Sequence, residues 1–216
     1  MYEGVIVRAT DYRAYYFDSN KKDIYFPNVS TLYSYKAYIG KHTINLEQGD
    51  CLYYISDDKK EAILKSGKQT IYSLHCATVI RGYNPPSKQN SLKEKTFLPY
   101  VNGCSTRQIF SPERLGDPTL QLLYIPPYST EQAHHIHSTA RVVYCLEGFG
   151  DSIVGMKNHK IKTKLKEGMV IILDEMSPHH FETQESHLKV IPLHIYSSVG
   201  NLEFNHPMFN GTHIIE

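Results

Sequence analysis

The sequence predicts an all-β fold from two observations. Tyrosine, which is enriched in β-strands, occurs 17 times among the 216 residues. Apolar residues fall in short alternating runs, and no long stretch shows the 3.6-residue period of an amphipathic helix. With 41% hydrophobic residues, the chain can form a core, either as one domain or as two small ones.

Composition excludes several classes of function. The 23 basic and 22 acidic residues are interspersed, so no basic patch indicates nucleic-acid binding. No apolar run is long enough to cross a membrane, and the charged N-terminal segment lacks the apolar core of a secretory signal. The cysteines lack CxxC spacing and lie in or near apolar runs, which is typical of reduced, buried thiols. They are Cys51, Cys76, Cys104 and Cys145. We therefore expect a cytoplasmic protein.

Two histidines mark the stretch that carries the chemistry. His135 and His137 lie two residues apart, just before the β-prone run 141–146. Side chains alternate faces along a strand, so these two imidazoles project from one face and His134 projects from the other. Neutral imidazole is the commonest metal ligand near neutral pH. The pair therefore predicts half of a metal site.

A third histidine follows a second strand. Gly168 indicates a turn, residues 169–173 a buried strand, and Pro178 a further turn that leads into His179. We predict that His179 completes the metal site. His180 alternates to the other face and is expected outside it, as is His134.

These residues resemble the two motifs of the cupin family. The first motif reads G-x5-H-x-H-x3-E-x6-G, and the second reads G-x5-P-x-G-x2-H. The corresponding residues are Ser129, His135, His137, Arg141 and Gly148 in the first and Gly168, Asp174, Met176 and His179 in the second. All the histidine spacings match, whereas the glutamate and three of the Gly and Pro positions differ. The resemblance covers residues 118–200.

The resemblance implies the double-stranded β-helix of cupins, a jelly-roll barrel. It also implies that His135, His137 and His179 bind one divalent metal ion. Gentisate, salicylate and cysteine dioxygenases are similar in having three histidines and no glutamate. The resemblance therefore implies Fe(II) as the metal, with Zn, Mn or Ni as alternatives.

Arg141 stands where the family has its glutamate ligand. A guanidinium stays protonated, so it cannot bind a cation. Arg141 shares a face with the first two histidines if the strand continues from residue 135 to 143. It could then bind a substrate carboxylate through two hydrogen bonds, as a substrate-binding and catalytic residue. The alternative is that Arg141 turns away and pairs with Glu147 or another acid.

Three further residues are candidates near the site. Tyr124 and Gln132 lead into the first motif and are expected to bind substrate at the entrance. His194 on the last strand either adds to the site or is structural, and His75 in a similar context favours the structural role. Residues 208–216 are expected to form a terminal arm.

The first half of the chain resembles the second. Residues 44–64 are similar to residues 163–183, and residues 71–79 to residues 190–198, at one shared offset of 119. Two segments that share an offset indicate an internal repeat.

The chain thus resembles a bicupin with two barrels. We expect a degenerate first barrel in residues 1–90, a metal-binding barrel in residues 91–216, and a polar linker over residues 82–103. At the offset of the repeat, Lys60 falls on His179, so we expect no metal in the first barrel. Its role is then packing, dimerisation or covering the second site, and a homodimer is expected.

The predicted function is a mononuclear non-haem Fe(II) dioxygenase that acts on a small carboxylate-bearing or enolic molecule. One alternative is a metal-dependent isomerase, lyase or hydrolase, in which the metal acts as a Lewis acid. Another is a non-enzymatic sensor or binding protein. The preference for a dioxygenase rests partly on analogy with other cupins, because this fold supports many chemistries.

Overall fold

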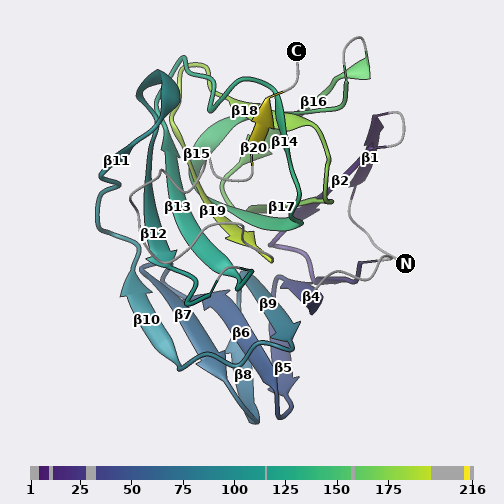
Figure 1. The fold of residues 1–216 in the computed structure, drawn as a ribbon, viewed down its shortest axis with the longest axis vertical. Helices are drawn as coiled ribbons and strands as arrows, with labels where there is room; N and C mark the ends of the chain where they lie inside the picture. The colour runs from purple at the N-terminus through teal and green to yellow at the C-terminus, as the bar shows by residue number, and fades with distance from the viewer. Residues whose placement is uncertain are drawn as a thin grey trace. The chain divides into compact units, whose positions relative to one another are not determined.

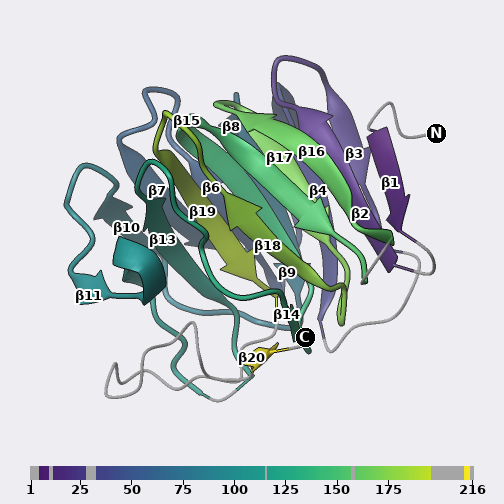
Figure 2. The same ribbon diagram turned by 90° about the horizontal axis from the view of Figure 1, so that it is seen from above.

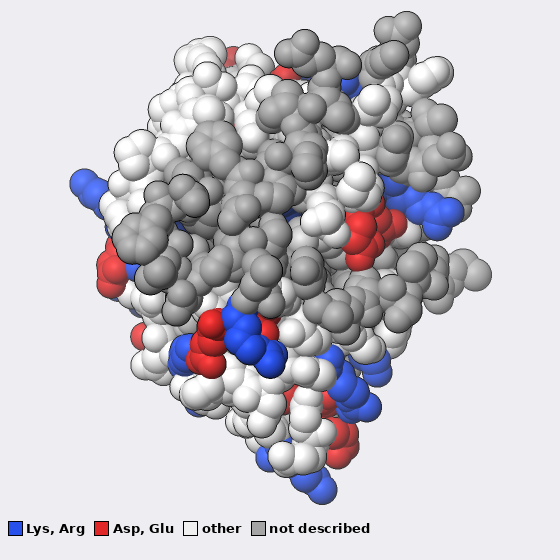
Figure 3. All heavy atoms as spheres, viewed as in Figure 1, with Lys and Arg blue, Asp and Glu red and all other residues white. Residues whose placement is uncertain are grey.

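The fold is all-β, as the sequence predicts. The computed structural model describes residues 5–9, 12–27, 33–114, 116–156, 159–195 and 212–214, and only the backbone for 5–9, 12 and 212–214. These residues form β-strands and a single 3-10 helix, Val101–Gly103. A helix able to cross a membrane is absent from this part of the chain. On the face shown in Figure 3, basic and acidic side chains lie next to one another.

The chain forms two compact units. The first contains Phe17–Glu94, and the second contains Val5–Tyr16 and Lys95–Glu216. This division departs from the expected domains in one respect, because an N-terminal segment belongs to the second unit. The expected linker also contains the strands β10 (Lys88–Ser91) and β11 (Leu98–Pro99). The expected terminal arm lies outside the described residues except for β20 (Thr212–Ile214).

The first unit has one larger and one smaller sheet. The larger sheet has the order β10-β7-β6-β9-β4-β3, and the smaller consists of β5 and β8. The strands, besides β10, are β3 (Asp23–Tyr25), β4 (Ser34–Ile39), β5 (His42–Leu46), β6 (Asp50–Ile55), β7 (Glu61–Ser66), β8 (Gln69–Ser73) and β9 (Cys76–Arg81). An apolar core that includes Ile44, Leu52 and Val79 fills this unit.

The second unit contains the longest strand, β15 (Arg141–Val154), which takes part in two sheets. One sheet has the order β1-β2-β17-β15-β19-β13-β12-β11, and in the other β16 and β18 flank β15 and β14 pairs with β18. The remaining strands are β1 (Val5–Ala9), β2 (Tyr12–Asp18), β12 (Ser105–Phe110), β13 (Thr119–Ile125), β14 (His135–His137), β16 (Ile161–Lys166), β17 (Met169–Leu173), β18 (His179–Glu182) and β19 (Leu188–His194).

A bulge and a glycine let β15 pass from one sheet to the other. The register with β19 shifts between Cys145 and Glu147, and such a bulge bends a strand. Gly148 has φ +80, and a Cβ there would lie 2.0 Å from the carbonyl oxygen of His187. Only glycine fits this close approach and this left-handed conformation. The bend places Arg141 and Val154 in different sheets.

The N-terminal strands complete the second unit. Figure 1 shows β17, β2 and β1 side by side, in agreement with their pairing order, and Figure 2 shows the same strands from above. Ala14 and Tyr16 belong to the core between the two sheets, together with Val143, Leu165 and Phe181. The Tyr16 hydroxyl donates a hydrogen bond to Ser152 Oγ at 3.0 Å.

The two units share a jelly-roll pairing order. The order β17-β15-β19-β13 in the second unit corresponds to β7-β6-β9-β4 in the first, and the pair β14–β18 corresponds to β5–β8. The sequence alignment at an offset of 119 is therefore wrong for the strands, because it matches β6 with β17, whereas the pairing gives β6 the place of β15.

A recurring turn explains why that alignment arose. In both units the chain crosses from one sheet to the other through a short turn at a glycine with nearly the same conformation, Gly49 (φ +86) and Gly168 (φ +83). Consequently Lys60, which lies just before β7, does not take the place of His179.

Candidate metal centre

Three buried histidines lie together inside the second unit. His135 and His137 come from β14, and His179 begins β18 directly opposite His135. One ring nitrogen of each residue lies within 4.8 Å of the others. The three side chains are 0%, 4% and 3% exposed. This cluster could hold a metal ion.

Backbone carbonyls orient two of the three imidazoles. His135 Nδ1 lies 2.8 Å from the Ala133 carbonyl oxygen, and His179 Nδ1 lies 2.7 Å from that of Ser177. A carbonyl only accepts hydrogen bonds, so each Nδ1 carries the proton and each Nε2 keeps its lone pair. Metal-binding histidines are oriented in this way. The donor set therefore fits a divalent metal ion.

Burial keeps these rings neutral. Desolvation, and next the charge of Arg141, lower the pKa of His135 to about 3. Desolvation also holds the pKa of His137 and of His179 well below the ordinary value. At neutral pH none of the three rings has to lose a proton before it binds a metal.

Arg141 reaches the cluster from the opposite sheet. Its NH1 group donates to His179 Nε2 at 3.1 Å, and its Nε donates to His194 Nδ1 at 3.2 Å. The side chain is buried, and among the described residues no carboxylate lies within ion-pair distance of it. Burial lowers its pKa to about 9, and Glu131 and Tyr100 oppose this shift, so the guanidinium stays charged at neutral pH.

Two expectations about Arg141 need correction. It does not share a continuous strand with His135, because β14 and β15 are separate strands and Arg141 pairs with β17 and β19. It nevertheless points toward the cluster, because it faces inward from the other sheet. It does not pair with Glu147, which lies 3.1 Å from His187 instead.

His194 also belongs to this centre. It lies directly opposite Arg141 on β19 and accepts a hydrogen bond from its Nε. A neutral ring that accepts at Nδ1 carries its proton at Nε2, and this buried Nε2 has no hydrogen-bond partner. His75 resembles His194 only in its neighbouring sequence. In the structure, His75 bonds to the Asp57 carbonyl oxygen in an exposed setting.

The structure adds a buried carboxyl group that nothing in the sequence marked. Glu131 is 2% exposed, and its Oε1 lies 3.5 Å from the Tyr100 hydroxyl, while its Oε2 has no partner. Desolvation raises the pKa of Glu131 to about 7, and Arg141 opposes the shift. Gln132, an expected substrate-binding residue, is buried here and accepts a hydrogen bond from Tyr100. No spacing in the sequence links Tyr100 to this loop.

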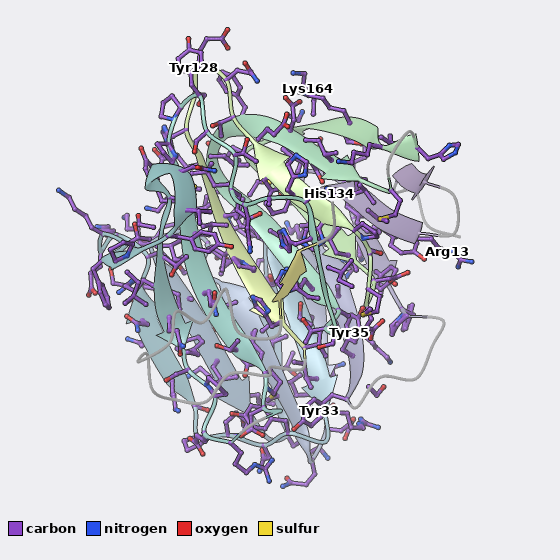
Figure 4. All side chains as sticks on the ribbon, turned by 45° about the horizontal axis from the view of Figure 1, so that its top comes forward. Arg13, Tyr33, Tyr35, Tyr128, His134 and Lys164 are labelled. Carbon is purple, nitrogen blue, oxygen red and sulfur yellow. The ribbon has the colours of Figure 1, made fainter. Side chains whose placement is uncertain are left out.

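The remaining candidates lie away from the cluster. Tyr124 alternates to the opposite face of β13 from Leu123, a core residue, and stacks on His187 with ring centroids 5.6 Å apart. Tyr124 therefore does not face the core of this unit. His134, labelled in Figure 4, and His180 hydrogen-bond to each other at 2.7 Å between their Nδ1 atoms, outside the cluster, as expected.

Buried polar atoms without hydrogen-bond partners gather in this unit. They include side-chain atoms of Gln108, Gln121, Glu131, Gln132 and His194. Each such atom costs about 1–3 kcal/mol if nothing satisfies it. The interior of this unit is therefore suited to a polar occupant.

Comparisons with known proteins show the fold and leave the reaction open. No family model matches the sequence, and no curated protein matches it significantly. A putative glyoxylate-induced protein of Pseudomonas aeruginosa has a similar structure, with TM-score 0.61 and 9% identity over 91% of this chain and 93% of that one. Cupin-2 proteins of Rhodospirillum rubrum and Rhodopseudomonas palustris match 52% and 50% of this chain, and 66% and 70% of theirs, with 17% and 15% identity and a TM-score of 0.39 each.

Proposed function

We propose that the second unit is a mononuclear metal enzyme that acts on a small anionic molecule. One observation carries this proposal: a buried arginine, with no carboxylate partner in the described part of the chain, lies 3.1 Å from a nitrogen of the three-histidine cluster. His135, His137 and His179 would hold the metal. Arg141 would bind the substrate.

Charge explains why the substrate would be an anion. Three neutral imidazoles leave the charge of a divalent ion uncompensated, and Arg141 adds a further positive charge nearby. An anion that enters the site satisfies both at once, whereas a neutral molecule leaves a buried guanidinium unpaired. His194 supports this arrangement, because its hydrogen bond to Nε fixes the direction of the Arg141 side chain.

The expected reaction is dioxygenation. Three protein ligands leave coordination positions open, which is typical of catalytic metal sites. Bound Fe(II) would supply the electrons that activate O2. In this reaction Arg141 positions the substrate carboxylate, and the apolar core around the cluster limits the access of water.

Oxygen consumption tests this reaction. The full chain is reconstituted with Fe(II) without oxygen, supplied with a panel of small carboxylates and enols, and then exposed to O2. We expect oxygen uptake with at least one carboxylate, and none with the His179→Ala variant. A metal-loaded protein that binds carboxylates but never consumes O2 would contradict dioxygenation and leave the metal site standing.

Glu131 favours a second candidate, a metal-dependent isomerase or lyase. A buried carboxyl group with a pKa of about 7 can both give and take a proton at neutral pH, as such reactions require. A Zn or Mn ion would supply Lewis acidity. Turnover of a carboxylate by Zn- or Mn-loaded protein without oxygen, lost in Glu131→Gln, would select this candidate.

A further inference from the structure

We propose that the second unit has a polar subsite, formed by Gln121 and Gln108, for a second functional group of the substrate. This group both donates and accepts hydrogen bonds, as a hydroxyl or a carboxamide does. The proposal rests on the proposed function, because it takes the substrate's anionic group to lie at Arg141.

The strand register places both glutamines inside the unit. Gln121 lies on β13 two residues before Leu123 and four before Ile125, and these two residues belong to the core between the sheets. Side chains two residues apart share a face, so Gln121 faces inward. Gln108 on β12 is directly opposite Gln121, and directly opposite residues of an antiparallel pair project from the same face.

Both amides are buried without partners. Gln121 is 0% exposed, and neither its amide nitrogen nor its amide oxygen has a hydrogen bond. The same holds for both amide atoms of Gln108. The two side chains could bond to each other across the strands but do not. They therefore present two amide NH2 groups and two amide oxygens to the interior, an arrangement that a buried polar group of a ligand would satisfy.

The register also places this subsite next to the anion-binding arginine. His194 is directly opposite Arg141 on one side and Thr119 on the other. Gln121 is two residues further along β13 than Thr119, which is a step of about 6.6 Å along the strand. His194, which is opposite Thr119, adds its unpaired Nε2–H group next to this subsite. A short carbon chain between two polar ends fits this spacing.

These features define the class of ligand. It is a short aliphatic anion with a hydroxyl or a carboxamide at its far end. A carboxylate with an apolar far end would leave the two amides buried and unpaired, so the site discriminates against it.

Calorimetric titration of the metal-loaded full chain tests the subsite. The probes are succinamate and isocaproate, which share a carboxylate and differ in a terminal carboxamide or isopropyl group. We expect the wild type to bind succinamate about tenfold or more tightly than isocaproate, the effect of one or two buried hydrogen bonds. Gln121→Leu should remove this preference and leave the metal content unchanged. Gln89→Leu, on an exposed glutamine of β10, should retain it.

Thermal unfolding provides an independent measurement. If the Gln121 amide is unsatisfied without ligand, Gln121→Leu should unfold at the wild-type temperature or above it. A large decrease would show that the amide serves the fold and would overturn the subsite. If Gln121→Leu fails to fold, Gln108→Leu takes its place in the titration, and an unchanged preference in it would overturn the subsite.

The two proposals fail in different ways. Equal affinity of the metal-loaded wild type for both probes would overturn the subsite and leave the metal centre and Arg141 standing. A protein that holds no metal at the three histidines would overturn the proposed function, whatever the probes do. Binding of neither probe by metal-loaded protein would overturn both the anion site and the subsite.

Discussion

The two units place an arginine in the same pair of facing positions, but on different strands and with different neighbours. In the first unit the end of β9 carries Arg81 directly opposite Asp50, and the Arg81 Nε lies 2.8 Å from the Asp50 carboxylate. In the second unit the end of β19 carries His194 directly opposite Arg141. Arg81 is 62% exposed, whereas Arg141 is buried.

On the proposed function, one fold serves structure in one unit and a ligand site in the other. A carboxylate neutralises the arginine of the first unit, so no charge remains for a ligand. The arginine of the second unit has a histidine as its neighbour, and its charge remains uncompensated inside the protein. Burial of such a charge is unfavourable, and a bound anion removes the penalty.

The strands that carry the proposed metal ligands, and their counterparts in the first unit, differ in the same way. His42 on β5, the strand that corresponds to β14, lies at Nε2 within 2.9 Å of the Asp23 carbonyl and 3.0 Å of the Ile39 carbonyl. Nε2 must therefore carry a proton, and it cannot bind a metal. We therefore expect the first unit to hold no metal. The reason is the hydrogen bonding of His42, and not a lysine in the place of a ligand.

Deletion of residues 1–16 should have the largest effect, and only on the second unit. It removes β1 and most of β2, with Ala14 and Tyr16 from the core and the Arg13 carbonyl that accepts from Ser177 Oγ. We expect loss of cooperative unfolding of the second unit and of metal binding, measured by thermal melts and metal analysis. A deletion variant that keeps both would show that the N-terminal strands are dispensable.

Arg141→Met should lower the affinity for small carboxylates about ten- to a hundredfold, because a charge-assisted hydrogen bond contributes roughly 1.5–3 kcal/mol. Methionine keeps much of the apolar volume and no longer donates to His179, so metal occupancy should hold or rise. Titration of Co(II)-loaded protein, followed by its absorption spectrum, measures both. Carboxylate binding equal to that of the wild type would make Arg141 structural.

Arg141→Glu sharpens the same comparison, because it introduces the glutamate of the motif that this segment resembles. We expect tighter metal binding and slower reaction, since a fourth ligand fills an open position.

Glu131→Gln should change how stability depends on pH in the metal-free protein. The pKa of Glu131 is raised from 4.5 to about 7, so the folded state holds this proton more tightly than the unfolded chain. The stability from this group is complete below pH 4.5 and is lost as the pH rises to about 7. The variant should gain up to roughly 3 kcal/mol over the wild type across this range. Urea unfolding at several pH values measures this gain. A difference in unfolding free energy between variant and wild type that does not change with pH would contradict the raised pKa.

Asp50→Asn in the first unit should have the smallest effect. The exposed guanidinium of Arg81 can return to water, so we expect only a small loss of stability and unchanged binding of metal and anions. Denaturant unfolding and the carboxylate titration measure these quantities. A change in anion affinity would show that the arginine of the first unit also serves the site.

The sequence was sufficient for the fold class and the histidine cluster because both follow from local patterns. Alternation of apolar residues predicts strands, and the spacing of His135 and His137 puts them on one face. The contact between Arg141 and the histidine cluster could not be derived in this way, since it depends on which strands pair across the barrel. Glu131 and Tyr100 meet through packing of two loops, and no periodicity marks such a contact. The N-terminal strands join the second unit through pairing with a strand more than 150 residues away.

Metal analysis of the purified full chain after reconstitution tests the central claim most directly. We predict one metal ion per chain, lost in His135→Ala, His137→Ala and His179→Ala and retained in His134→Ala and His180→Ala. The last two variants remove imidazoles next to the cluster in sequence but outside it in space. Two metal ions per chain, or full occupancy in His179→Ala, would contradict the assignment of a single three-histidine centre to the second unit.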